Sequence, residues 1–172
     1  THKNFEFIFN NDRSGASLTW IYFYGEKKIP KIILYVEDGD LFRFSLGDRT
    51  RFATSYLYSF SGKPKEVLAL IEKKGDAVKK MLERGKMIWE YRDELAKLLL
   101  KTVRPFNINV GTFTVPAHNT PEFLRSDVGN ALAVKLQKTV ATFVIDKDMV
   151  RLHFRGTNNC TPSALDLAKI LG

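Results

Sequence analysis

Three carboxylates fall within four positions of the stretch YVEDGDLFRF, residues 35–44. They are Glu37, Asp38 and Asp40. Carboxylate oxygens are the ligands that hard divalent cations prefer in proteins. Acidic residues beside a glycine are also common in solvated turns. The spacing alone therefore leaves two interpretations open, a metal site and a surface turn.

Histidine and cysteine add no local ligand set. His2, His118 and His153 are far apart, and no HxH or HxxxH pair exists. Cys160 is the single cysteine, so the chain forms no internal disulfide, and one cysteine cannot build a zinc cluster. This cysteine usage favours an intracellular location, cytoplasmic or organellar. No window is long and apolar enough to predict a membrane span.

The elements around the acidic residues predict an α/β architecture. Ser14 is a plausible N-cap for a buried helix over residues 16–23, which Gly25 would end. Residues 31–38, KIILYVED, form a continuous apolar run typical of a strand covered on both faces in a parallel sheet. That strand would place Asp38 at its carboxyl end, where α/β sheets bind ligands. Residues 50–60 look helical.

The rest of the chain predicts a helical middle followed by a second α/β lobe. Pro64 marks a helix start, and Asp76 is a candidate cap for a longer helix with apolar residues at three- and four-residue steps. Residues 106–115 alternate like one strand, and residues 126–136 predict a helix. Residues 141–145 and 149–154 predict a hairpin. A final helix would begin at Pro162, capped by Thr161 or Ser163.

Two blocks of this sequence resemble one known superfamily. DRSGASLTWIYFYG and IPKIILYVEDGDLFRFSL form the first block. VPAHNTPEFLRSDVGNALAVKL, ATFVIDKDMVRLHFRG and SALDLAKILG form the second. In this order they resemble the DHH phosphoesterase superfamily, in the branch of exopolyphosphatase-like proteins and oligonucleotide phosphodiesterases that carry a DHHA1 domain. The Asp-His-His motif and the GGGH loop of that family do not occur in this sequence.

The resemblance implies a domain division and a set of site residues. Residues 1–62 would be the C-terminal part of a DHH-like domain, with a parallel sheet and flanking helices. Residues 63–104 would be a helical connector, and residues 105–172 a DHHA1-like α/β domain. By the resemblance, Asp38 would ligate Mn²⁺ or Mg²⁺ in a two-metal site. Arg155 would bind a substrate phosphate. Thr157, Asn119 and His153 are the further candidates near that phosphate.

Three functional hypotheses follow. One is a structural subunit in which Asp38 is only a turn residue, and the other two give the protein a biochemical role. The first is a divalent-metal-dependent phosphoesterase that hydrolyses phosphodiester or phosphoanhydride bonds of short oligonucleotides, cyclic dinucleotides or polyphosphate. The second is a catalytically inactive homologue that serves as a nucleic-acid-binding or ribonucleoprotein scaffold subunit. A net charge of +8 suits a nucleic acid or nucleotide phosphate as partner, and it is equally compatible with solvated helix surfaces. We also expect a homodimer or an assembly subunit.

Overall fold

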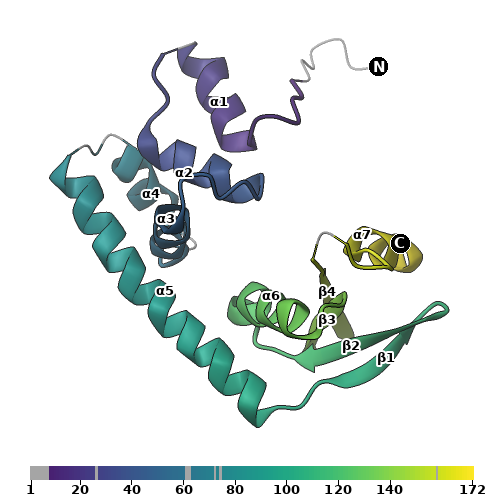
Figure 1. The fold of residues 1–172 in the computed structure, drawn as a ribbon. Coiled ribbons are helices and arrows are strands. Elements are labelled where there is room, and N and C mark those ends of the chain that lie inside the picture. Colours follow the sequence, from purple (N-terminus) through teal and green to yellow (C-terminus); the bar gives the residue numbers. More distant parts are fainter. Residues whose placement is uncertain (1–7, 26, 61–62, 72, 74, 158) are drawn as a thin grey trace. The chain divides into compact units, whose positions relative to one another are not determined.

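The computed structural model describes residues 8–172, except residues 26, 61, 62, 72, 74 and 158. The chain divides into two compact units, Thr1–Glu90 and Tyr91–Gly172. The division falls inside the long helix α5, Asp76–Thr102, which Figure 1 shows as one continuous rod. The three-part division expected from the sequence stays a prediction. Each unit is described by itself.

The first unit is built from helices. These are α1 (Gly15–Tyr24), α2 (Lys31–Asp40), α3 (Asp48–Tyr58), α4 (Pro64–Ile71) and the beginning of α5. The Ser14 hydroxyl accepts a hydrogen bond from the Ser17 amide at 3.2 Å, and Gly25 ends α1 with φ 66°. The predicted cap and stop of this helix are therefore confirmed. The predicted helices over residues 50–60 and from Pro64 are confirmed as well.

The predicted strand over residues 31–38 is wrong, because these residues form helix α2. Ile32 and Tyr35 are three positions apart, so a helix places both on one face, where they join a core with Ala53, Leu70 and Met81. A short apolar run has no periodicity that separates a strand from a buried helix. The expected parallel sheet is therefore not found in the described part of residues 1–62.

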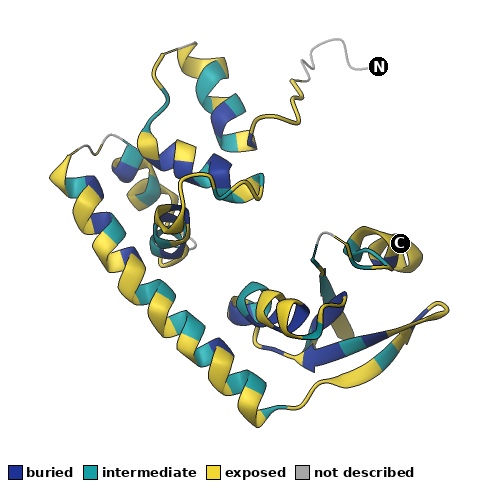
Figure 2. Cartoon of the chain, in the orientation of Figure 1, coloured by how far each residue is buried: buried dark blue, intermediate teal, exposed yellow. Residues whose placement is uncertain are grey.

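The surface of α1 differs from the expectation of a buried helix. Tyr22, Phe23 and Tyr24 are 58%, 72% and 52% exposed, and Ser17 is the buried residue that the structure gives for this helix. Figure 2 shows α1 mostly in the colours of intermediate and exposed residues. Because α1 is apolar all round, packing one face against α2 leaves the remaining apolar side chains outside.

Helices α3 and α5 approach each other with backbone against backbone. A Cβ atom built on Gly85 of α5 would lie 2.0 Å from the carbonyl oxygen of Phe52 in α3. The Phe52 and Trp89 rings pack beside this point with centroids 5.8 Å apart. Gly85 is therefore required by the packing of the two helices.

The second unit contains a four-stranded sheet in the order β1-β2-β3-β4. The strands are β1 (Phe106–Val110), β2 (Phe113–Asn119), β3 (Val140–Asp146) and β4 (Met149–Arg155). Strands β2 and β3 are parallel, and the other pairs are antiparallel. The predicted hairpin of β3 and β4 is confirmed. The single strand expected over residues 106–115 is wrong, because the chain turns back at Gly111, whose φ is 58°.

One helix covers each face of this sheet (Figure 1). Leu132 and Ala133 of α6 (Arg125–Leu136) pack on Val140. Leu167 of α7 (Ala164–Leu171) packs on Val115 and Ala141 from the other side. A 3₁₀ turn, η1 (Glu122–Leu124), leads into α6. The predicted cap of the last helix is confirmed at Ser163, which forms a capping box with Asp166.

The chain is a mixed α/β protein, as expected, and its four-stranded sheet lies in the second unit. No helix in the described part of the chain is both long and apolar enough to cross a membrane.

Candidate functional site

The Asp38 side chain lies near the C-terminal end of α2, where it holds the following loop. Its Oδ1 atom accepts hydrogen bonds from the Ser45 amide at 2.9 Å and the Ser45 hydroxyl at 2.6 Å. Its Oδ2 atom accepts from the Leu46 amide at 3.1 Å and from the Thr50 hydroxyl. The backbone carbonyl of Asp38 also accepts from the amides of residues 43 and 44. Asp38 thus organises the path from α2 to α3.

The electrostatics of Asp38 follow from these contacts. The residue is only 4% exposed. Burial by itself raises the pKa of this carboxyl, but the hydrogen bonds from Ser45, Thr50 and Leu46 outweigh burial, so the pKa is lowered. Asp38 is therefore a carboxylate at neutral pH, and its charge is shared among four donors.

Glu37 connects the same end of α2 to the start of α1. Its carboxylate accepts from the Ser14 amide at 3.1 Å and from the Arg13 guanidinium at 3.3 Å. Burial by itself raises the pKa of Glu37. The hydrogen bonds and the Arg13 charge outweigh burial, so the pKa is lowered. The two buried acidic residues of α2 therefore stabilise two different junctions of the first unit.

These contacts bear on how well the acidic cluster fits a metal. A carboxylate offers about four acceptor positions, and Asp38 already uses four. Asp40 is an exposed residue, and partial desolvation of its carboxyl by the surrounding protein raises its pKa. Within the described residues, no group of three or more His, Cys, Asp and Glu side chains gathers as a metal site requires. The described residues therefore do not fit a two-metal site by themselves, and the metal role of Asp38 stays a prediction.

In the second unit, β4 presents a row of basic side chains on the face that α6 covers. Arg151, His153 and Arg155 alternate with Leu152 and Phe154, which join the core on the α7 side. His153 and Arg155 thus share a face, as the alternation of the sequence predicts. Guanidinium groups match phosphate oxygens in geometry and charge, so the phosphate-binding role of Arg155 stays a prediction that this face is compatible with.

Arg155 is positioned by α6. Its Nη2 atom donates to the Ser126 hydroxyl at 3.0 Å, and its Nη1 atom donates to the Phe154 carbonyl at 2.9 Å. A Cβ atom on Gly129 would lie 3.0 Å from Cγ of Arg155, so the aliphatic part of this arginine passes directly over the glycine. The absence of a side chain at Gly129 therefore lets Arg155 lie close to the α6 backbone.

An acid–base cluster that the sequence did not single out lies beside this row. Glu122 of η1 forms an ion pair with Arg125 through Oε1, and its Oε2 atom lies 3.4 Å from Nε2 of His153. Arg151 pairs with Asp146, which raises the pKa of Arg151, and the charge of Glu122 adds to that effect. The i,i+3 spacing of Glu122 and Arg125 was the available signal, but their contact with β4 depends on the tertiary fold.

The other candidate residues lie elsewhere in the second unit. Asn119 is exposed at the end of β2 opposite Phe143, and alternation places it on the α7 side of the sheet, away from the face of Arg155. The Thr157 hydroxyl lies 3.1 Å from Sγ of Cys160, and this contact lowers the pKa of the thiol. The structure brings Arg155 and His153 to one face but does not bring Asn119 to it.

The remaining histidines have different settings. His118 is fully buried, with Nδ1 at 2.8 Å from the Thr120 hydroxyl and Nε2 at 3.1 Å from the Val103 carbonyl. These partners satisfy both ring nitrogens, so His118 is a structural residue of the sheet. His2 lies outside the described residues.

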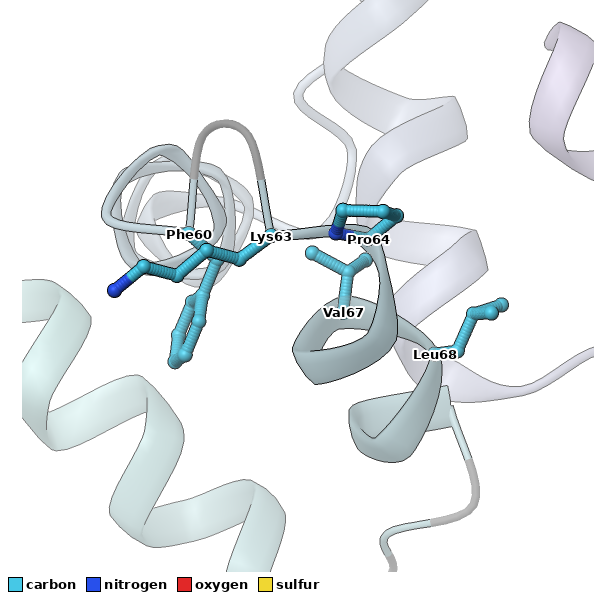
Figure 3. Close-up of a pocket in the computed structure, with 5 residues that line it drawn as sticks. All are labelled: Phe60, Lys63, Pro64, Val67 and Leu68. Atoms are coloured by element: carbon cyan, nitrogen blue, oxygen red, sulfur yellow. The ribbon is translucent and has the colours of Figure 1, made fainter.

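An apolar groove of about 550 Å³ lies in the first unit at the start of α4. Figure 3 shows its lining residues, Phe60, Lys63, Pro64, Val67 and Leu68. Lys63 is the one ionisable group among them. Among its described lining residues, the groove therefore lacks the converging polar groups that orient a substrate for chemistry.

Comparison with known proteins gives one informative relative. An uncharacterized protein of Acanthamoeba polyphaga mimivirus is 31% identical over 162 residues, which cover 88% of this chain. The chain spans about 37% of that relative's length. No family model matches the sequence, and no solved structure matches it significantly.

Proposed function

We propose that this chain is part of a divalent-metal-dependent phosphoesterase whose second unit binds a phosphate of the substrate. The substrate class is short oligonucleotides, cyclic dinucleotides or polyphosphate. The observation that carries the proposal is the setting of Arg155, on a face shared with Arg151 and His153 and positioned by Ser126 and Gly129. The resemblance to the DHH superfamily gives this arginine the phosphate-binding role.

The metal part of the proposal rests on the resemblance and on Asp38. When bound, Mn²⁺ or Mg²⁺ would supply a water activated for attack on phosphorus. The chain's own contribution would be to bind and orient the phosphate through guanidinium groups. Ligands beyond the described residues would have to complete the metal set, because Asp38 stands without a described group of ligands around it.

The binding test compares two forms of one short oligonucleotide, with and without a terminal phosphate, by fluorescence anisotropy with the full chain. We expect the phosphorylated form to bind more tightly, and Arg155→Ala to remove about tenfold or more of that preference, since a hydrogen bond to a charged group contributes about 1.5–3 kcal/mol. Arg104→Ala is the matched control, because Arg104 is an exposed arginine of the same unit. An unchanged preference in Arg155→Ala would remove Arg155 from the site.

The activity test measures Mn²⁺-dependent release of mononucleotides from the same oligonucleotide. We expect Asp38→Asn to abolish turnover and Asp40→Asn to retain it. Unfolding must be measured alongside, because Asp38 also holds residues 45–50. Full turnover by a folded Asp38→Asn variant would contradict the metal role.

A second candidate function is a non-catalytic subunit that binds nucleic acid within a larger assembly. The observation that favours it is the saturation of the Asp38 carboxylate by four protein donors. Phosphate-dependent binding without any Mn²⁺-dependent product would support this candidate over the phosphoesterase. A homodimeric or assembly state stays a prediction of the sequence.

A further inference from the structure

Glu122 lies among three positively charged or protonatable side chains of the second unit. Its Oε1 atom pairs with Arg125, its Oε2 atom lies 3.4 Å from Nε2 of His153, and its charge reaches Arg151. The residue lies in η1, immediately before α6 and beside the row of basic side chains on β4. The carboxylate therefore already neutralises part of the positive charge of Arg125 and Arg151.

We propose that Glu122 is an internal competitor that occupies one anion-binding position of the β4 face, and that a terminal phosphate displaces its carboxylate from Arg125 and His153. The inference rests on the proposed function, because it assumes that phosphate binds on this face. It adds a position for the phosphate, one further binding residue, Arg125, and a reason for selectivity among phosphate ligands.

Unmet hydrogen-bonding capacity marks the position. Oε2 of Glu122, Nε of Arg125 and Nε2 of His153 are buried atoms that have no hydrogen-bond partner within the described structure. Buried polar atoms in folded proteins are nearly always paired, so three such atoms in one cluster call for an explanation. Glu122 and His153 are close enough to interact but are not aligned for a hydrogen bond. A group with more oxygens than a carboxylate could accept from both Arg125 and His153.

Charge decides which ligand can displace the carboxylate. A phosphate monoester carries about −1.5 to −2 charges at pH 7, whereas a carboxylate and a phosphodiester each carry one. A terminal phosphate therefore gains more from Arg125 and the β4 cations than Glu122 does, and an internal diester does not. The competition by Glu122 thus selects ligands that end in a phosphate.

The variant Glu122→Gln tests this competition, because glutamine keeps the shape and removes the charge. The probe is the short oligonucleotide with a terminal phosphate, titrated by anisotropy at fixed ionic strength with the full chain. We expect the variant to bind about threefold to tenfold more tightly than the unaltered protein, as exposed ion pairs and binding-site charges commonly contribute at this level. The control is Glu94→Gln, which makes the same change on the exposed surface of α5 in the same unit, where Glu94 pairs with Lys97.

A double variant connects the gain to the released cation. Glu122→Gln with Arg125→Gln should lose most of the gain, because Arg125 is the group that Glu122 occupies. A role of Glu122 in folding alone would produce no gain in either variant. Equal or weaker binding by Glu122→Gln, or an equal gain in Glu94→Gln, would overturn the inference.

The outcomes separate this inference from the proposed function. Phosphate-dependent binding by the unaltered protein with no gain in Glu122→Gln would overturn the competition and leave the proposed phosphate site standing. Binding that becomes detectable only in Glu122→Gln would support the competition directly. No phosphate preference in either protein would overturn both.

Discussion

The carboxylate of Asp38 receives all four of its hydrogen bonds from a single stretch of chain, residues 45–50. Two of these donors are backbone amides, those of Ser45 and Leu46, and the other two are the hydroxyls of Ser45 and Thr50. The contribution of Asp38 to the stability of the first unit therefore comes from the negative charge that its two oxygens share. Removing that charge while keeping the size of the side chain isolates its contribution.

We expect Asp38→Asn to lower the free energy of unfolding of the first unit by about 2 kcal/mol, because an amide group would face the Leu46 amide in place of a charged acceptor. Urea unfolding followed by tryptophan fluorescence measures this, since Trp20 and Trp89 both belong to the first unit. Asp40→Asn is the control and should change stability by less than about 0.5 kcal/mol. Equal effects of the two variants would contradict the structural role of Asp38.

The lowered pKa values of Glu37 and Asp38 predict acid lability of the first unit. Their ordinary values are 4.5 and 3.8, and the folded protein holds both pKa values lower. Below the ordinary values the unfolded chain takes up protons that the folded chain does not, so stability is lost as pH falls below about 4.5. Asp40, whose pKa is raised by burial, acts in the opposite direction.

Fluorescence-detected urea unfolding between pH 6 and pH 3 would measure this loss. Glu37→Gln and Asp38→Asn should each show a shallower decline than the unaltered protein, because each removes one of the responsible protonation equilibria. If stability falls equally steeply with pH in both variants, titratable groups other than Glu37 and Asp38 cause the acid lability.

At the scale of helices, the crossing of α3 and α5 at Gly85 gives the sharpest prediction. Alanine favours a helix over glycine by about 1 kcal/mol. At Gly85, however, the added methyl would lie 2.0 Å from the Phe52 carbonyl oxygen, and backbone atoms cannot move aside as a flexible side chain can. We expect Gly85→Ala to lower the free energy of unfolding by about 1–3 kcal/mol, the usual range for overpacking.

The matched control is Gly15→Ala at the start of α1, where nothing lies within 4 Å of the added atom. This change should be neutral or slightly stabilising. Urea unfolding of the two variants measures the difference, and stabilisation by Gly85→Ala would show that α3 and α5 do not meet in this way.

The sequence predicted elements well where a local signal marks their ends. Ser14, Gly25, Pro64 and Ser163 each begin or end a helix as expected, because a cap or a stop acts on its own backbone. Residues 31–38 carry no such signal, and their helix follows from packing of Ile32 and Tyr35 against α3, α4 and α5. Gly111 is a glycine that can form a turn, but the alternation of the residues around it predicts one continuous strand.

The candidate site was predictable only where its residues follow a local pattern along one strand. Alternation alone put His153 and Arg155 on one face of β4. The hydrogen bonds of Asp38 and the contact of Glu122 with β4 join residues that lie 7–12 and 31 positions apart, and only the folded chain brings them together. Residue spacing carries no information about such pairs.

For the whole molecule, a net charge of +8 predicts that nucleic-acid binding depends strongly on salt. We expect the logarithm of the association constant for a single-stranded oligonucleotide to fall linearly with the logarithm of salt concentration. Arg155→Ala should lower the slope by about 0.7, the contribution of one phosphate contact on a single strand. Anisotropy titrations from 50 to 200 mM salt would measure it, and salt-independent binding would contradict an electrostatic partner.

The position of β4 at the edge of the sheet has a consequence for handling the protein. An edge strand offers unpaired backbone groups on which a strand of another molecule can add, and charged side chains are a common protection against such stacking. The charged side chains of Arg151 and Arg155 supply that protection here. Variants that neutralise both of these residues at once therefore risk intermolecular strand pairing and precipitation, so light scattering should accompany every binding measurement made with them.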